Sequence, residues 1–355
     1  MITNHFVALL LASILTSVTI LVTYSSYESF SLSYGQQFSS GTEGQKRIVV
    51  VTVGCGKSIY FALNSLKSIL ISKRTDAPTA VYLFTEKNQH GMAREKYDSF
   101  LRSNCTGCRS VELFLLHPSY PSEKGRLWLK MWRPCATQRL FLSDISAFTD
   151  AVIYVDSDTI FLAPVEDLWE QFALMNDSQA IGMASEHEIG MEWDAHYGRL
   201  SHVPFVPPLG VNSGVLLMNL TKLRAVNFVG ELVRDYRTYK ENLNYHDQDL
   251  LNIYLHRHPD RFFHLNCSWN YRMSHCIKRR CNCRSARDHG VRLVHGNAKT
   301  FIKKTTQEFR WVSDAIAQVD LPATRDVKEE LIRRSFKTTV NHTFCGSLLF
   351  NAFMS

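Results

Sequence analysis

The chain has 355 residues, of which 45% are hydrophobic and 21% are charged, so it can bury a large core in one or two domains. Its 40 Lys and Arg against 33 Asp and Glu give a formal net charge of +7, which is a mild excess for this length. Because the sequence contains no long basic block and no zinc-finger or RNA-binding signature, we expect no nucleic-acid partner.

The N-terminal segment predicts a membrane anchor. Residues 6–23 (FVALLLASILTSVTILVT) carry no charge, and at about 1.5 Å per residue they are barely long enough to cross ~30 Å of hydrocarbon. We expect a cytoplasmic tail at 1–5, a signal anchor at 6–23 and a stem rich in Ser, Gly, Gln and Thr at 24–46. A cleaved signal peptide is the alternative. Either way the rest of the chain is expected in the ER or Golgi lumen, in the anchored case as a single-pass type II protein.

Sequons and cysteines agree with a lumenal location. The chain has 9 cysteines, so at least one thiol stays unpaired within it. Cys267, Cys276, Cys281 and Cys283 lie close together with two histidines nearby, but their spacing matches no common zinc pattern. We therefore expect disulfides, whose pairing the spacing does not determine. Asn-x-Ser/Thr sequons occur at Asn104, Asn176, Asn219, Asn266 and Asn341.

The globular region opens with alternating strands and helices. A β-branched run at 48–53 ends at a glycine turn, and residues 58–71 carry apolar side chains at helical spacing. A strand, a glycine turn and a helix open many nucleotide-binding α/β units, although the full G-x-G-x-x-G is missing here. Further strands are expected at 81–84 and 111–115, separated by a helix at 92–101. A helix is also expected from Trp128 to Phe148, and its Arg139 fits equally well an ion pair with nearby carboxylates or a contact to a phosphate or nucleobase.

An acidic turn interrupts an apolar run at 151–162 (AVIYVDSDTIFL). Such a run predicts a strand buried on both faces, and Asp156 and Asp158 should lie where that strand ends in a crevice. Residues i and i+2 of an extended chain point the same way, so both carboxylates can face one cation. Oxygen ligands suit Mg²⁺ or Mn²⁺ bound together with substrate phosphates. The alternative is a plain acidic turn after a strand.

The second half continues the α/β pattern, with a helix at 164–172, a strand at 180–184 and a small-residue bend at 210–214 that leads into a buried strand. A further helix should begin at Asp247, which could cap it, although capping leaves Gln248 unexplained. A strand at 291–297 ends in a His-Gly turn. In a doubly wound sheet His295 would lie beside the acidic strand and supply a third metal ligand, which favours Mn²⁺. The tail from 310 to 355 is expected to be helical.

Several segments, in matching order, together resemble glycosyltransferase family 8 and, more narrowly, the glucoside xylosyltransferases. The Asp-x-Asp strand and the Asn-Ser-Gly and Asp-Gln segments carry the resemblance to the superfamily. The segments are WRPCATQRLFL, VIYVDSDTIFL, EHE, GVNSGVLLMNLTKLR, HDQDLLNI, CSWNYR, VHGN and NHTFCG.

The resemblance implies a GT-A (Rossmann-like) fold, a single α/β domain at 47–318 with a mixed, mostly parallel sheet, followed by a helical extension at 319–355. It implies UDP-xylose as the donor and Mn²⁺ as the metal. The acceptor would be glucose O-linked to an EGF-like repeat of a Notch-type glycoprotein, and the product an α1,3-linked xylose formed with retention.

The resemblance also implies roles for individual residues. Asp247 and Gln248 would border the reacting anomeric carbon. The order of Gly296 and Lys299 after His295 departs from the common His-x-x-Gly-x-x-Lys of the family, which leaves the phosphate role of Lys299 open. Metal binding would fall to Asp156, Asp158 and His295, the uridine to Val53, Gly54 and Cys55, and other donor contacts to Arg139, Ser157, Asn212, Ser213, Gly214, Gly296 and Lys299.

Gln248 is a poor nucleophile, so we favour attack from the leaving-group face. Gln248 would then stabilise an oxocarbenium-like state while the phosphate takes the acceptor proton. One alternative keeps the fold and changes the sugar, as in a xyloside xylosyltransferase or a UDP-hexose enzyme. The other is a non-catalytic lumenal protein that binds glycans.

Overall fold

The computed structural model describes residues 47–101, 109–120, 128, 135–145, 148, 150–188, 196–277, 280–318 and 343–354. The expected tail, anchor and stem at 1–46 lie outside these residues. Among the helices that the structure describes, none is long and apolar enough to span a bilayer.

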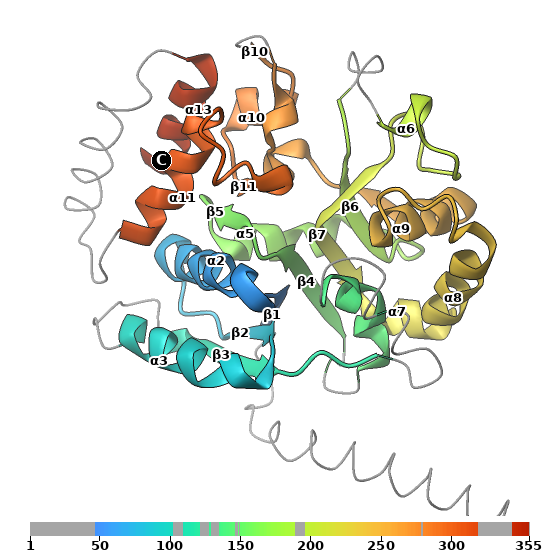
Figure 1. Ribbon diagram of the computed structural model, residues 1–355, viewed down its shortest axis with the longest axis horizontal. Helices are drawn as coiled ribbons and strands as arrows, with labels where there is room; N and C mark the ends of the chain where they lie inside the picture. Colours follow the sequence, from blue (N-terminus) through green and yellow to red (C-terminus); the bar gives the residue numbers. More distant parts are fainter. Residues whose placement is uncertain are drawn as a thin grey trace, which may run out of the picture.

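A seven-stranded mixed sheet forms the centre of the domain (Figure 1). Its first four strands are parallel, β7 runs antiparallel to both of its neighbours, and β6 pairs in parallel with β8 at the edge. This arrangement confirms the expected α/β GT-A-like fold with a mixed, mostly parallel sheet. In sheet order the strands are β3 (Val111–Leu116), β2 (Thr79–Phe84), β1 (Ile48–Val53), β4 (Ala151–Asp156), β7 (Val211–Asn219), β6 (Ile181–Ser185) and β8 (Phe262–His264).

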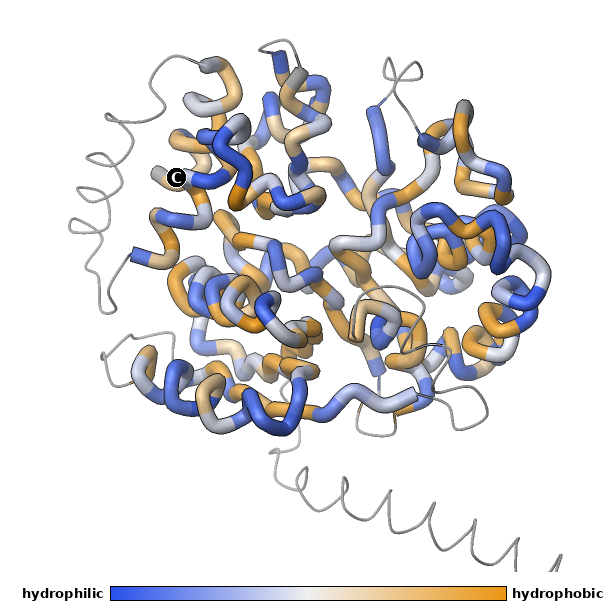
Figure 2. Tube along the Cα trace, in the orientation of Figure 1, coloured by the Kyte–Doolittle hydropathy of each residue, from blue (hydrophilic) through white to orange (hydrophobic). Residues whose placement is uncertain are grey.

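Helices cover both faces of the sheet, which explains the unbroken apolar run of β4. Successive side chains of a strand point to opposite faces. Val152 and Tyr154 accordingly join one core cluster, whereas Ile153 and Val155 join the other. One face packs against α7 (Leu220–Ala225), α8 (Phe228–Tyr239), α9 (Asp247–Arg257) and η4 (Ala136–Asp144), and the other against α2 (Ile59–Ser72), α3 (His90–Leu101) and α5 (Val165–Trp169). In Figure 2 the covering helices alternate between apolar and polar residues, as expected for helices with one face on a core.

A third apolar cluster lies beyond the sheet, where α10, α11 and α13 gather (Figure 1). Here β11 pairs antiparallel with β5 and forms a separate two-stranded sheet. The helices are α10 (Arg284–His289), α11 (Gln307–Gln318) and α13 (Phe344–Met354), and the strands are β5 (Thr159–Phe161), β9 (Cys276–Ile277), β10 (Arg280–Cys281) and β11 (Leu293–His295). The shorter elements are η1 (Gly56–Ser58), η2 (Lys87–Gln89), η5 (Glu170–Leu174), α6 (His196–Arg199), η6 (Pro259–Arg261), η7 (Cys267–Asn270), η8 (Met273–His275) and η9 (Asn297–Lys299).

Disulfides tie distant segments together. The described cysteines pair as Cys55–Cys135, Cys267–Cys283 and Cys276–Cys345, and Cys281 is a buried free thiol. Zinc ligation by the 267–283 cluster is thereby ruled out, in favour of the expected disulfides. Because disulfides persist in oxidising compartments, this domain belongs to the secretory pathway.

Two expectations about secondary structure are wrong. Within the expected Trp128–Phe148 helix, Trp128 is helical, but Ala136–Asp144 forms the 3₁₀ helix η4 rather than an α-helix, after Cys135 with a φ of 71°. The strand around His295 does not join the main sheet, because β1 and β7 already occupy both sides of β4. It reaches the acidic strand through β5 instead.

Candidate active site

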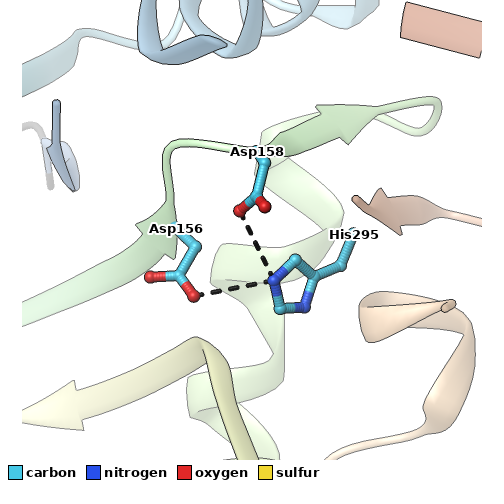
Figure 3. Close-up of side chains that lie close together, drawn as sticks. All are labelled: Asp156, Asp158 and His295. Atoms are coloured by element: carbon cyan, nitrogen blue, oxygen red, sulfur yellow. Dashed lines mark ion pairs between the residues drawn. The ribbon is translucent and has the colours of Figure 1, made fainter. Parts of the chain in front are cut away.

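Three potential metal ligands converge beyond the end of β4 (Figure 3). Asp156 ends that strand, the following turn carries Asp158, and β11 places His295 opposite Thr159 of β5. The Nε2 atom of His295 lies 3.6 Å from Asp156 Oδ2 and 3.6 Å from Asp158 Oδ1. All three ligand atoms lie within 4.8 Å of one another, as the sequence predicted.

Hydrogen bonds behind His295 fix the orientation of its ring. Asn270 Nδ2 donates to Asn212 Oδ1 at 2.8 Å, so its Oδ1 is left to accept from His295 Nδ1 at 2.9 Å. A proton on Nδ1 leaves the lone pair of Nε2 facing two carboxylates. One imidazole nitrogen and two carboxylates suit Mn²⁺, so these residues fit a divalent cation.

Gly214 is required by the same imidazole. A Cβ added at this position would lie 2.1 Å from His295 Cε1. The glycine is therefore explained by close packing rather than by a turn.

Arg139 links two carboxylates beneath the cavity. Its Nη2 lies 2.7 Å from Asp156 Oδ1 and its Nε lies 2.8 Å from Asp247 Oδ2, while Nη1 donates to the carbonyl of Ser213 at 2.6 Å. The Tyr154 hydroxyl donates a hydrogen bond to Asp156 Oδ1 at 2.9 Å, and the Tyr154 ring packs against the Arg139 guanidinium. Of the two roles considered for Arg139, the ion pair is the one that the structure shows.

Burial and charge shift the titration of this pair. Burial alone would lower the pKa of Arg139, but the carboxylates of Asp156 and Asp247 raise it overall, so the guanidinium stays charged. The pKa of Asp247 is raised, first by burial and then by Asp156, and Arg139 opposes both effects.

Gln248 is held by hydrogen bonds at both ends of its amide. The backbone N–H of Ser213 donates to Gln248 Oε1 at 3.0 Å, and Asn212 Nδ2 donates to the same oxygen at 3.2 Å. Gln248 Nε2 in turn donates to Glu186 Oε2 at 2.9 Å. Its oxygen therefore points into the protein network in a fixed orientation.

These groups line one cavity of about 440 Å³. The cavity brings together 11 of the predicted site residues: Val53, Arg139, Asp156, Ser157, Asp158, Asn212, Ser213, Gly214, Asp247, Gln248 and His295.

The other four predicted site residues do not line this cavity. Gly54 packs against Ala62, and Cys55 forms its disulfide. Gly296 donates its N–H to the Asp158 carbonyl at 2.6 Å, and Lys299 has a left-handed backbone with a φ of 65°. Direct donor contacts by these four residues stay predictions.

The expected cap at the start of α9 is wrong. The helix begins at Asp247 with His246 in the N-cap position, and no side chain caps it. Asp249 Oδ2 instead accepts from the backbone N–H of Tyr245 at 2.6 Å. The carboxylate of Asp247 points into the cavity network rather than along the helix axis.

Several site residues had no role in the sequence analysis. Glu186 lies in the cavity wall, and Asn270 and Arg272 lie behind it. The segments EHE and CSWNYR contain these residues and were signals of the family, but their spacing alone suggested no chemistry. Further lining residues are Ser58, Ala136, Tyr154, Asn244, Tyr245, His246, Asn297 and Ala298.

Comparison with known proteins places this chain in a family. The family model described as glycosyl transferase family 8 matches residues 29–300. The chain belongs to glycosyltransferase family 8.

Its relatives within family 8 include glucoside xylosyltransferases. Glucoside xylosyltransferase 1 of Danio rerio is 35% identical over 317 residues, covering 84% of this chain and 74% of the relative. The human protein of the same name is 33% identical over 328 residues, covering 88% and 71%. Glucoside xylosyltransferase 2 of Mus musculus is 34% identical over 318 residues, covering 85% and 68%.

Solved structures of transferases share the fold. Mouse xyloside xylosyltransferase 1 in its apo form gives a TM-score of 0.50 at 19% identity, covering 72% of this chain and 99% of that chain. The galactosyltransferase LgtC in complex with donor and acceptor sugar analogues gives 0.55 at 17% identity, covering 77% and 97%. The chain is thus a family 8 glycosyltransferase with a GT-A-like domain and a site that could hold a divalent metal.

Proposed function

We propose that this chain transfers xylose from UDP-xylose to glucose O-linked on EGF-like repeats of Notch-type glycoproteins, in α1,3 linkage and with retention. The observation that carries the proposal is one cavity that holds both the Asp156–Asp158–His295 cluster and the Asp247–Gln248 pair. Relatives named glucoside xylosyltransferase support the choice of sugar and acceptor.

The two carboxylate oxygens of Asp156 have different surroundings. Its Oδ1 pairs with the Arg139 guanidinium and accepts a hydrogen bond from the Tyr154 hydroxyl. Its Oδ2 faces His295 and would be the oxygen that binds a cation. Mn²⁺ held by Asp156, Asp158 and His295 would act as a Lewis acid on the diphosphate leaving group. Arg139 offsets part of the negative charge of Asp156 and Asp247 and holds both carboxylates in place, which favours a preorganised site.

The stereochemical course follows from the state of Gln248. Its amide oxygen already accepts from Ser213 and Asn212, which leaves it poorly placed for nucleophilic attack. We therefore favour attack from the leaving-group face, with Gln248 beside the developing positive charge. Mass spectrometry of the enzyme after rapid quenching tests this point, and a xylosyl adduct on Asp247 would contradict it.

For the cellular setting we propose a type II protein of the Golgi or ER membrane, anchored by residues 6–23 with its catalytic domain in the lumen. Protease protection of tagged full-length protein in microsomes tests the topology. Digestion of the globular region without detergent would contradict it.

The enzymatic test is an assay with UDP-xylose and an O-glucosylated EGF repeat, with and without Mn²⁺. We expect Mn²⁺-dependent xylose transfer, and at least about a 100-fold lower rate for Asp158→Asn because a metal ligand is lost. Asp150→Asn, which removes an exposed carboxylate just before β4, is the matched control.

Faster turnover of UDP-glucose or UDP-galactose would identify a hexose enzyme. Acceptance of a xylosyl-glucose acceptor in place of glucose would identify a xyloside xylosyltransferase. Unchanged activity of Asp158→Asn in cells would favour a non-catalytic glycan-binding protein.

A further inference from the structure

A fully buried arginine lies behind the cavity wall. Arg272 has an exposed fraction of 0%, and its Nη1 donates to Glu186 Oε1 at 2.8 Å. Its Nη2 donates to the Ser185 carbonyl at 2.6 Å, so one planar guanidinium holds both the end of β6 and the first side chain beyond it.

Glu186 uses its second oxygen toward the cavity. Its Oε2 accepts from Asn212 Nδ2 at 2.7 Å and from Gln248 Nε2 at 2.9 Å. The carboxylate therefore connects Arg272 to the two amides that border the proposed sugar position. Because an unpaired buried charge is strongly destabilising, the buried Arg272 and Glu186 side chains must keep their mutual geometry.

Further hydrogen bonds connect Asn212 to His295 of the Asp156–Asp158–His295 cluster. Asn212 Oδ1 accepts from Asn270 Nδ2, and Asn270 Oδ1 accepts from His295 Nδ1. An unbroken series of polar contacts thus runs from Arg272 through Glu186, Asn212 and Asn270 to His295. Each member of the series is less than 10% exposed.

We propose that Arg272 is a positioning residue that sets two parts of the site at once: the amide of Gln248 through Glu186, and the ring of His295 through Glu186, Asn212 and Asn270. The inference rests on the proposed function, since it takes this cavity to be the donor site. A purely structural ion pair would contribute to stability and leave the kinetic and metal-binding constants unchanged.

The test compares Arg272→Met with Arg292→Met. Arg292 also packs on η7 through the Trp269 ring, but it pairs with Asp167, outside the series. Thermal unfolding, kcat and KM for UDP-xylose turnover, and the Kd for Mn²⁺ in the presence of UDP are measured for each variant.

For Arg272→Met we expect kcat to fall ~10- to 100-fold and Mn²⁺ to bind several-fold more weakly, as found when residues behind a metal ligand are lost. Arg292→Met should keep the parental kcat and Kd. Glu186→Gln/Arg272→Met, which removes the unpaired charge, should recover part of the loss in kcat. A lower Tm for Arg272→Met with unchanged kcat and unchanged Mn²⁺ Kd would overturn the proposal.

Two further measurements keep the outcome decisive. If Arg272→Met does not fold, Arg272→Lys replaces it, because lysine keeps the charge and loses the planar fork. A lower kcat and weaker Mn²⁺ binding for Arg272→Lys support positioning, and parental values contradict it. If the parent protein does not turn over UDP-xylose, the proposed function fails, and Mn²⁺ binding with UDP still tests Arg272.

Discussion

At the scale of single residues, the site depends on how closely β7 and β11 approach each other. The backbone of Gly214 touches the imidazole of His295, and a methyl group between them has no room. Position 214 therefore affects the candidate metal site of Asp156, Asp158 and His295, although it offers no ligand atom.

Gly214→Ala is expected to lower Mn²⁺ affinity and activity by at least about 10-fold, because the added Cβ would displace the His295 ring. Isothermal titration with Mn²⁺ and the transfer assay measure the two effects. Gly91→Ala on α3 is the matched control, since a Cβ there meets nothing within 4 Å. In a helix it should be neutral or stabilise the fold by about 0.5–1 kcal/mol. Equal Mn²⁺ affinity in both variants would show that His295 tolerates the methyl group.

At the scale of elements, the Cys55–Cys135 disulfide joins the turn after β1 to the start of η4. That turn follows Val53 in the cavity wall, and η4 carries Arg139. The bond therefore connects the expected uridine region to the element that carries Arg139, which pairs with Asp156 and Asp247.

Cys55→Ser/Cys135→Ser should lower the free energy of unfolding by about 2–4 kcal/mol and raise KM for the donor. Cys276→Ser/Cys345→Ser is the matched control, because its sequence separation of 69 residues is close to the 80 of the first pair. Chain-entropy arguments predict a similar loss of stability for both, so denaturant unfolding should give similar values. A donor KM that rises equally in both variants would argue against a specific role for the first bond.

Glu166 on α5 fastens the loop after α2. Its Oε1 accepts from Thr75 N at 3.0 Å and from Thr75 Oγ1 at 2.9 Å, and Lys73 Nζ lies 3.4 Å away. Burial alone would raise the pKa of this carboxyl, but the hydrogen bonds and Lys73 lower it overall.

A lowered pKa in the folded chain means that ionised Glu166 stabilises the fold above the pKa of the unfolded chain, and that this stability is lost as the pH falls through the folded pKa. Glu166→Gln should therefore cost about 1–3 kcal/mol at pH 7, and its deficit against the parent should shrink in acid. Urea unfolding between about pH 3 and pH 7 measures both trends. A deficit that stays constant across this range would exclude the charge of Glu166 as its cause.

At the scale of the whole molecule, the C-terminal helix is part of the same body as the site. Leu349 and Ala352 of α13 lie in the apolar cluster that also contains Ile160 of β5 and Val294 of β11. The disulfide of Cys345 adds a covalent tie to this cluster.

Truncation after Gln318 should therefore lower Tm and weaken Mn²⁺ binding, because the support of the β5–β11 pair is lost. Differential scanning fluorimetry with and without Mn²⁺ and UDP checks this on a chain that begins at residue 47. The parent and the Cys276→Ser/Cys345→Ser variant are the comparisons that separate loss of the helix from loss of the disulfide. An unchanged Tm and Mn²⁺ Kd would show that 47–318 folds as a complete domain.

The sequence predicted the features that depend on short-range pattern. The apolar strand with Asp156 and Asp158, the alternation of strands and helices, and the metal cluster with His295 all follow from local spacing and family resemblance. The sequence did not predict how His295 comes to lie beside Asp156 and Asp158. It does so through the pairing of β5 with β11, two strands that are far apart in sequence, and local patterns do not determine which distant strands pair. The ion pair of Arg272 with Glu186 could not be predicted for the same reason, since the two residues lie 86 positions apart in sequence.

The pairing of β5 with β11 has one more consequence. Asp158 directly precedes β5, and His295 ends β11. An ion bound by both residues would therefore link two segments that are distant in sequence. Amide protons along this small ribbon should then exchange with deuterium far more slowly in the loaded enzyme than in the empty one. The ion would then stabilise the tertiary structure as well as take part in catalysis.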